Sequence, residues 1–110
     1  ARTEDFSGEE PPASVRFPVV ALQAHGAALG LHFYRGTAFP AAYRHDAFVA
    51  QHGSWNRSVP VGYRILRVRF DAAGRPTGRE VFAEGWLRGR AVSGRPVAIA
   101  ELDDGSLLVS

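Results

Sequence analysis

Short apolar and alternating runs, separated by glycine, proline and charged turns, dominate the chain from residue 19 onward. The clearest run spans residues 62–70, where Leu66, Val68 and Phe70 fall on one face and two arginines fall on the other. A period of two residues is typical of a strand with two different faces. Breakers are so frequent that we expect little helix, and the short turn at residues 40–44 is the exception.

Further apolar runs have the length of single strands. They predict strands at residues 29–34, 46–51, 79–84, 97–100 and 106–109. Asp103, Asp104 and Gly105 separate the last two, and this sequence predicts a hairpin because glycine accepts a positive φ without steric cost. The sequence therefore predicts four short antiparallel strands, followed by two more that begin a second unit.

Four antiparallel strands per unit are typical of a β-propeller blade, so we predict an all-β fold that is part of a propeller. Strand spacing alone leaves a sandwich or an open barrel as alternatives. Residues 1–18 are polar and carry paired prolines, which predicts a linker or loop. Residues 19–110 then form the propeller portion. Because the last predicted strand reaches the final residue, we expect the chain to be part of a longer one.

Composition narrows the chemistry. The chain has 110 residues and no cysteine, which excludes disulfides, zinc–thiolate sites and thiol nucleophiles within it. All 13 basic residues are arginine, so no lysine can act as a base or form a Schiff base. A formal charge of +2 does not favour a nucleic-acid partner. No apolar run approaches the length of about 20 residues that a transmembrane helix needs.

Two segments carry side chains that are unusual for a scaffold. His25 precedes small residues at the start of a predicted strand, which places an imidazole on a loop rim. The run from His52 to Arg57 follows a strand end and contains His52, Trp55, Asn56 and Arg57. Trp55 can stack on a flat ligand, and Arg57 can hold a carboxylate through two hydrogen bonds. The alternatives are a capping or core histidine at position 25, and a tryptophan that packs between blades with incidental polar neighbours.

A third segment contains three arginines within eight residues, ahead of a predicted strand. Pro96 favours an extended backbone at Arg95, which would direct its side chain toward the edge where the strand begins. Arg88 and Arg90 fit a solvated basic loop equally well. The histidines at 25, 32, 45 and 52 lack a specific metal-site spacing, and the chain has no HExxH, P-loop or GxGxxG motif.

Together these segments resemble the glucose/sorbosone dehydrogenase family. The similarity rests on the run HGSWNR at residues 52–57, the GYR that follows at 62–64, and the GRPV at 94–97. It also includes the segments at residues 25–34 and 39–50 and extends to the last residue. The resemblance covers residues 19–110 and places the chain in the C-terminal portion of such a protein.

The resemblance implies a six-bladed β-propeller, of which this chain supplies one four-stranded blade and the first strands of the next. It implies pyrroloquinoline quinone (PQQ) as cofactor, bound flat over the central channel, together with calcium. It also implies oxidation of an aldose or sorbosone-type sugar by hydride transfer to the quinone, in the periplasm or outside the cell. The family's general-base histidine lies in an earlier blade, so no catalytic residue is assigned here.

Position by position, the resemblance assigns cofactor contacts to six side chains: His25, His52, Trp55, Asn56, Arg57 and Arg95. Soluble glucose dehydrogenases carry a lysine in the loop that contains Trp55, and Arg57 or His52 stands in its place here. The calcium ligands are not identifiable, because backbone carbonyls leave no side-chain signature.

Two alternatives remain at this point. One is a propeller-derived module that binds a sugar or a protein without redox activity. The other is a chain that associates with copies of itself, because strand edges left exposed can pair. We expect no turnover from the 110 residues alone, since they cannot enclose a channel. The expected partners are a sugar substrate and further propeller blades.

Overall fold

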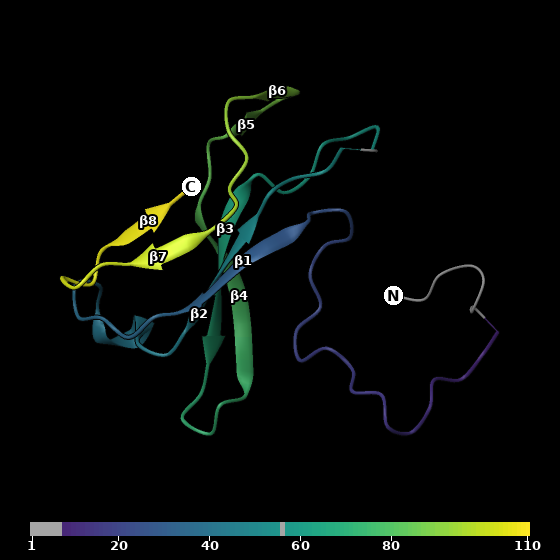
Figure 1. The fold of residues 1–110 in the computed structure, drawn as a ribbon, viewed down its shortest axis with the longest axis horizontal. Helices are drawn as coiled ribbons and strands as arrows, with labels where there is room; N and C mark the ends of the chain where they lie inside the picture. Colours follow the sequence, from purple (N-terminus) through teal and green to yellow (C-terminus); the bar gives the residue numbers. More distant parts are fainter. Residues whose placement is uncertain (1–7, 56) are drawn as a thin grey trace.

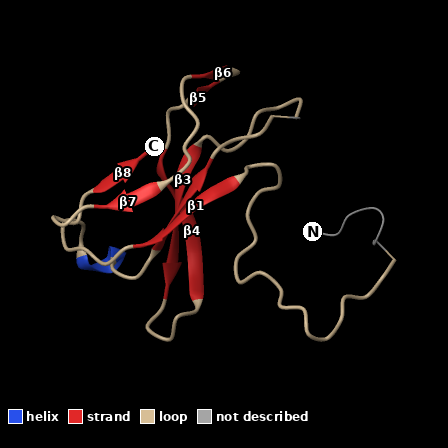
Figure 2. Ribbon diagram, viewed as in Figure 1, coloured by secondary structure: helices blue, strands red, loops and turns tan. Residues whose placement is uncertain are grey.

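The fold is an antiparallel all-β arrangement built on a four-stranded sheet. The computed structural model describes residues 8–55 and 57–110. The sheet has the order β1-β2-β3-β4 and consists of β1 (Ala28–Phe33), β2 (Ala47–Gln51), β3 (Arg64–Phe70) and β4 (Pro76–Ala83). Figure 1 shows the sheet's twist, and Figure 2 shows that strands provide most of the regular structure. Sequential neighbours pair throughout, which is the arrangement of a β-meander.

Two smaller ribbons follow the sheet in the chain. A short ribbon pairs β5 (Leu87–Arg88) with β6 (Ala91–Val92), and a hairpin pairs β7 (Ile99–Glu101) with β8 (Leu107–Val109). The hairpin lies beside β1 and β2, whereas the short ribbon projects from the upper edge of the molecule in Figure 1. The hairpin is therefore the element that covers the sheet.

Strand β2 is buried along its whole length. It lies between β1 and β3, and its apolar side chains alternate between the two faces of the sheet. Phe48 and Ala50 lie on one face with Ile65, and Val49 lies on the other face with Leu66. Burial of a phenylalanine such as Phe48 contributes about 1.5–3 kcal/mol. The sheet thus has an apolar layer on both faces.

The first apolar face packs against the final hairpin. Tyr34 and Phe48 are fully buried there, and Ile99 and Leu107 of the hairpin pack against them. Gly30 allows the close approach, because a Cβ at this position would lie 2.5 Å from the carbonyl oxygen of Val97. The Tyr34 hydroxyl donates to the carbonyl of Gly105 at 2.7 Å, which fixes the hairpin turn against the sheet.

The second apolar face is covered only in part by described residues. Val20 and Leu22 of the N-terminal segment pack against its cluster of Ala47, Val49, Leu66 and Val68. Leu31 and Phe33 of β1 continue this face, since they pair with Val49 and Ala47, yet both are exposed. This face therefore carries exposed apolar surface beside its buried cluster.

A buried ion-pair network joins the sheet to the turn before β2. The Arg67 guanidinium donates to Asp46 at 2.7 Å, to Glu80 at 2.9 Å and to the carbonyl of Ala42 at 3.1 Å. It also lies 3.7 Å from the centre of the Tyr43 ring. Burial acts to lower the pKa of Arg67, but the hydrogen bond and charge of Asp46 outweigh it and raise that pKa.

The strand positions predicted from the sequence agree closely with the structure. Strand β3 begins at Arg64 instead of residue 62, because Gly62 and Tyr63 both have positive φ. Strand β4 begins earlier than expected, at Pro76, which an edge strand tolerates at its first position. The predicted turn at 40–44 is a 3-10 turn (Ala41–Tyr43), and residues 8–18 contain no strand or helix.

Candidate functional site

Three chain segments meet at one end of the sheet, which we call the loop end. Residues 24–27 precede β1, residues 52–63 join β2 to β3, and residues 84–98 follow β4. Because neighbouring strands run in opposite directions, the start of β1, the end of β2, the start of β3 and the end of β4 all lie at this end. The amide of His52 donates to the carbonyl of Ala27 at 2.9 Å, and the amide of Gly53 donates to that of Gly26 at 3.0 Å. All six side chains predicted to contact the cofactor belong to these three segments.

Close backbone packing at the loop end depends on glycine. Gly53 has a φ of +109°, and a Cβ there would lie 2.5 Å from the Tyr63 ring. Gly62 has a φ of +89°, and a Cβ there would lie 2.9 Å from the Gly53 Cα atom. Both the backbone conformation and the space therefore require glycine at these two positions.

Arg95 lies against the loop that contains Trp55. Its Nη2 donates to the carbonyl oxygens of Gly53 and Ser54, both at 3.0 Å, and its Nε lies 3.4 Å from the His52 carbonyl. Its guanidinium carbon lies 5.4 Å from the centre of the Tyr63 ring, within the range of a cation–π contact. The structure thus brings Arg95 to the predicted loop, where it binds backbone carbonyls.

Ser54 and Tyr63 complete this arrangement, and neither was among the residues predicted from the sequence. The Tyr63 hydroxyl donates to the Ser54 carbonyl at 2.5 Å, and the amide of Val61 donates to the Ser54 hydroxyl at 3.0 Å. The amide of Ser54 donates to the carbonyl of Val61 at 2.9 Å. The motif at residues 62–64 was the only sequence signal that pointed to Tyr63. The positive φ on which its position depends cannot be inferred from a pattern of residue types.

The predicted outer side chains lie on the surface of the loop end. Trp55 is 87% exposed, and within the described residues its indole packs against little else. Arg57 is exposed, and its Nη1 lies 3.5 Å from the carbonyl of Ala24, in the same segment as His25. His25 is exposed as well, with a positive φ of 66°. Asn56 lies outside the described residues.

His52 differs from these surface residues because its side chain is partly buried. Its Nδ1 atom is buried, and no hydrogen-bond partner for it exists among the described residues. An unsatisfied buried polar atom costs about 1–3 kcal/mol, and such atoms are rare in folded proteins. Among the described residues, the Nδ1 atom of His52 therefore has no hydrogen-bond partner to offset its burial.

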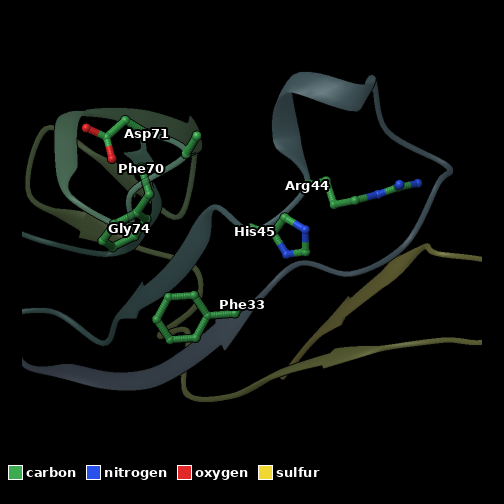
Figure 3. A pocket seen from close by; sticks show the side chains of 7 residues that line it. Phe33, Arg44, His45, Phe70, Asp71 and Gly74 are labelled. Carbon is green, nitrogen blue, oxygen red and sulfur yellow. The ribbon is translucent and has the colours of Figure 1, made fainter.

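A cavity lies elsewhere among the described residues, at the opposite end of the sheet. It measures about 480 Å³, and its lining is shown in Figure 3: Phe33, Arg44, His45, Phe70, Asp71, Ala72 and Gly74. The side chains of Arg44 and Asp71 point away from one another in this view. The Asp71 carboxylate accepts from the amides of Ala73 and Arg75 in its own turn. The polar groups therefore do not converge on one ligand.

Two further properties concern the described part of the chain. No group of three or more acidic, histidine or cysteine side chains within it is placed to hold a metal ion. None of its helical segments is long and apolar enough to cross a membrane. The predicted calcium site consequently has no side-chain cluster to which it can be assigned.

Comparison with known sequences connects these features to a family. The sequence model of the TrAA12-like family matches residues 3–88, which is most of the chain. An uncharacterized protein of Borreliella burgdorferi is 44% identical over 101 residues, which cover 88% of this chain and 27% of that protein.

Solved structures give the same relationship. The PQQ domain of pyranose dehydrogenase from Coprinopsis cinerea, in its holo form, is 28% identical over 78% of this chain, with a TM-score of 0.54. Two structures of the Trichoderma reesei protein of carbohydrate-active enzyme family AA12, an iodide and a calcium structure, cover 80% of this chain. Their identities are 28% and 25%, and their TM-scores are 0.57 and 0.55.

The chain spans about a quarter of the length of these relatives, between 22% and 27% of each. Its fold is that of a portion of a PQQ-dependent dehydrogenase-like domain. The resemblance noted from the sequence is thus confirmed at the level of the PQQ-dependent fold, whereas the sorbosone branch stays a prediction.

Proposed function

The chain belongs to the TrAA12-like family, and we propose that it forms part of a PQQ-dependent dehydrogenase that oxidises an aldose or sorbosone-type sugar. The observation that carries this proposal is the meeting of Arg95 with the loop that contains Trp55. Arg95 lies about forty residues further along the chain, yet it donates to the carbonyls of Gly53 and Ser54 at 3.0 Å. Two sequence-distant segments thus build one polar surface beside an exposed indole.

The groups at the loop end fit PQQ. PQQ is a planar tricarboxylate, so its binding requires a flat apolar surface and fixed cationic donors. Trp55 supplies an exposed indole, and Arg57 supplies an exposed guanidinium. Arg95 uses Nε and Nη2 for the loop, which leaves Nη1 for a carboxylate. The buried Nδ1 of His52 adds a polar atom whose capacity is unused among the described residues.

We assign to this chain the binding and orientation of the cofactor. When bound, PQQ supplies a quinone that accepts the two electrons and two protons released as a sugar hydroxyl becomes a carbonyl. Trp55 provides the face on which the ring system stacks, and Arg57 and Arg95 hold its carboxylates. No catalytic base is assigned among these residues, and the resemblance places it in an earlier blade.

The architecture supports a place within a propeller. Strands β1–β4 form one blade-like meander, and the β7–β8 hairpin covers one face of it. The other face leaves Leu29, Leu31 and Phe33 exposed on one side of β1. We propose that a preceding blade covers these side chains in a six-bladed propeller. Self-association of the chain through the same surface is the competing arrangement.

Calcium and location complete the proposal. A calcium ion would be held by backbone carbonyls and by residues outside this chain, because the described residues contain no suitable cluster. We place the protein in the periplasm or outside the cell, in line with the family resemblance.

A titration of the full-length protein with PQQ tests this function. The expected result is a saturable change in PQQ absorbance and, with calcium present, reduction of a redox dye when an aldose is added. A protein that reduces dye only with PQQ and sugar together supports the dehydrogenase. A protein that binds sugar without binding PQQ would instead be a non-catalytic propeller-derived module.

A further inference from the structure

We propose that Arg95 is a positioning residue, which acts on the cofactor by holding the backbone from His52 to Ser54 and so directing Trp55. This inference rests on the proposed function for its cofactor and on the geometry of the loop end for its mechanism. It differs from a simple cofactor contact, in which the guanidinium would act on a carboxylate alone.

Two of the three nitrogens of the Arg95 guanidinium, Nε and Nη2, are directed at the loop backbone. Nη2 donates to two successive carbonyls, those of Gly53 and Ser54, and Nε is directed at the carbonyl of His52. Three consecutive carbonyls facing one cation are possible only when the backbone turns around it. A guanidinium fits this task because its N–H groups form a rigid planar fork, which an ammonium group lacks.

Tyr63 acts on the same backbone from the other end of the loop, immediately before β3. Its hydroxyl donates to the Ser54 carbonyl, so this oxygen receives hydrogen bonds from both Tyr63 and Arg95. Tyr63 is buried and has a positive φ of 58°, a conformation that costs a non-glycine residue free energy. The strained backbone of Tyr63 thus coincides with the position from which its hydroxyl reaches the Ser54 carbonyl.

These contacts determine how Trp55 leaves the sheet. Ser54 immediately precedes Trp55, and its amide, hydroxyl and carbonyl all have partners. The indole itself is 87% exposed, so side-chain packing does not fix it. The orientation of Trp55 thus depends on the backbone before it, which Arg95 and Tyr63 hold.

A set of four variants separates positioning from direct contact. Arg95→Ala removes the fork and the charge, Arg95→Lys keeps the charge, and Tyr63→Phe removes only the hydroxyl of a buried side chain. Arg88→Ala is the matched control, because Arg88 is an exposed arginine of the same segment that follows β4.

The first measurement is hydrogen exchange of the peptide containing residues 52–58 in the full-length protein without PQQ. Positioning predicts faster exchange by about tenfold in Arg95→Ala and by a few-fold in Tyr63→Phe, with little rescue in Arg95→Lys. The second is PQQ affinity, which should fall by about tenfold or more in Arg95→Ala and by a few-fold in Tyr63→Phe. Arg88→Ala should change neither quantity.

The double variant gives the sharpest comparison. Since both donors act through the Ser54 carbonyl, the combined loss of affinity should differ from the product of the two single losses. Unchanged exchange in Arg95→Ala, with PQQ affinity lost there but retained in Tyr63→Phe, would overturn the inference and leave the proposed function intact. Absence of PQQ binding in the unaltered protein would refute the proposed function, together with the cofactor role assigned to Arg95.

Discussion

The Nε2 atom of His32 lies 2.7 Å from Oε1 of Glu101, across the junction between β1 and β7. The same carboxylate oxygen accepts from the amide of Arg35 at 3.0 Å. The hydrogen bond with His32, followed by that with the Arg35 amide, lowers the pKa of Glu101 below its ordinary value. One carboxylate therefore fastens the final hairpin to the first strand of the sheet.

This contact predicts that acid loosens the hairpin. A carboxylate whose pKa is lowered by folding stabilises the folded form fully above its unfolded pKa of about 4.3. That contribution disappears as the pH falls through the lowered value. We expect the protection of the β7 and β8 amides against hydrogen exchange, taken relative to the intrinsic rate at each pH, to fall below about pH 4, and Glu101→Gln to show the low protection already near neutral pH.

The control for this prediction is Asp103→Asn, in the turn of the same hairpin. Asp104 is unsuitable, because the side chain and amide of Ser106 lower its pKa through hydrogen bonds. Asp103→Asn should retain the acid-dependent change in exchange. If Glu101→Gln retained it as well, the pH dependence would arise from another group.

The close approach at Gly30 gives a second prediction. A Cβ at this position would lie 2.5 Å from the Val97 carbonyl oxygen and 3.1 Å from the Ala98 Cα atom. Gly30→Ala should therefore move the hairpin away from β1 and lower the free energy of unfolding by about 1–3 kcal/mol. Gly8→Ala is the control, since a Cβ there has no neighbour within 4 Å. Equal denaturation midpoints for the two variants would contradict this packing.

The strands were predictable from sequence because alternation and turn residues are local signals. The hairpin at Asp103–Gly105 is the clearest case, and Gly105 has the positive φ of 85° that such a turn favours. Alternation also placed Arg67 on the opposite face from Leu66, but it could not show that this face is buried. Burial of Arg67 depends on Asp46 and the Tyr43 ring, which come from a distant part of the chain. The β5–β6 ribbon, with two residues in each strand, was too short to predict.

The network around Arg67 supplies a third prediction. Arg67→Ala would leave the Asp46 carboxylate charged and buried without its cation, which costs about 3–5 kcal/mol in comparable sites. The pair with Glu80, which is far more exposed, should contribute less than about 1 kcal/mol of this. Chemical denaturation measures the loss. Arg69→Ala, on the same face of the same strand but exposed, should change the free energy of unfolding by less than about 0.5 kcal/mol.

The structure brings the segments of the candidate site together, whereas cofactor binding by these residues stays a prediction. Side-chain chemistry indicated which residues can bind a planar anion, and the structure gathers the segments of His25, Trp55 and Arg95 at the loop end. The sequence did not indicate that Arg95 donates to backbone carbonyls, because carbonyls are present at every residue. It did not indicate Tyr63 either, whose role depends on a positive φ and on the space left by Gly53.

The two tryptophans provide the last prediction, because the structure gives them opposite roles. Trp55 is 87% exposed at the loop end, whereas Trp86 packs against the core cluster of Tyr34, Phe48, Ala50 and Ile65. Trp55→Ala should leave the free energy of unfolding unchanged and weaken PQQ binding by about three- to tenfold, through lost stacking. Trp86→Ala should lower the free energy of unfolding by about 2 kcal/mol. Paired denaturation curves and PQQ titrations of the full-length protein measure both quantities. A Trp55→Ala variant that unfolds more easily but binds PQQ normally would return this indole to a packing role and remove the flat surface on which the proposed cofactor site depends.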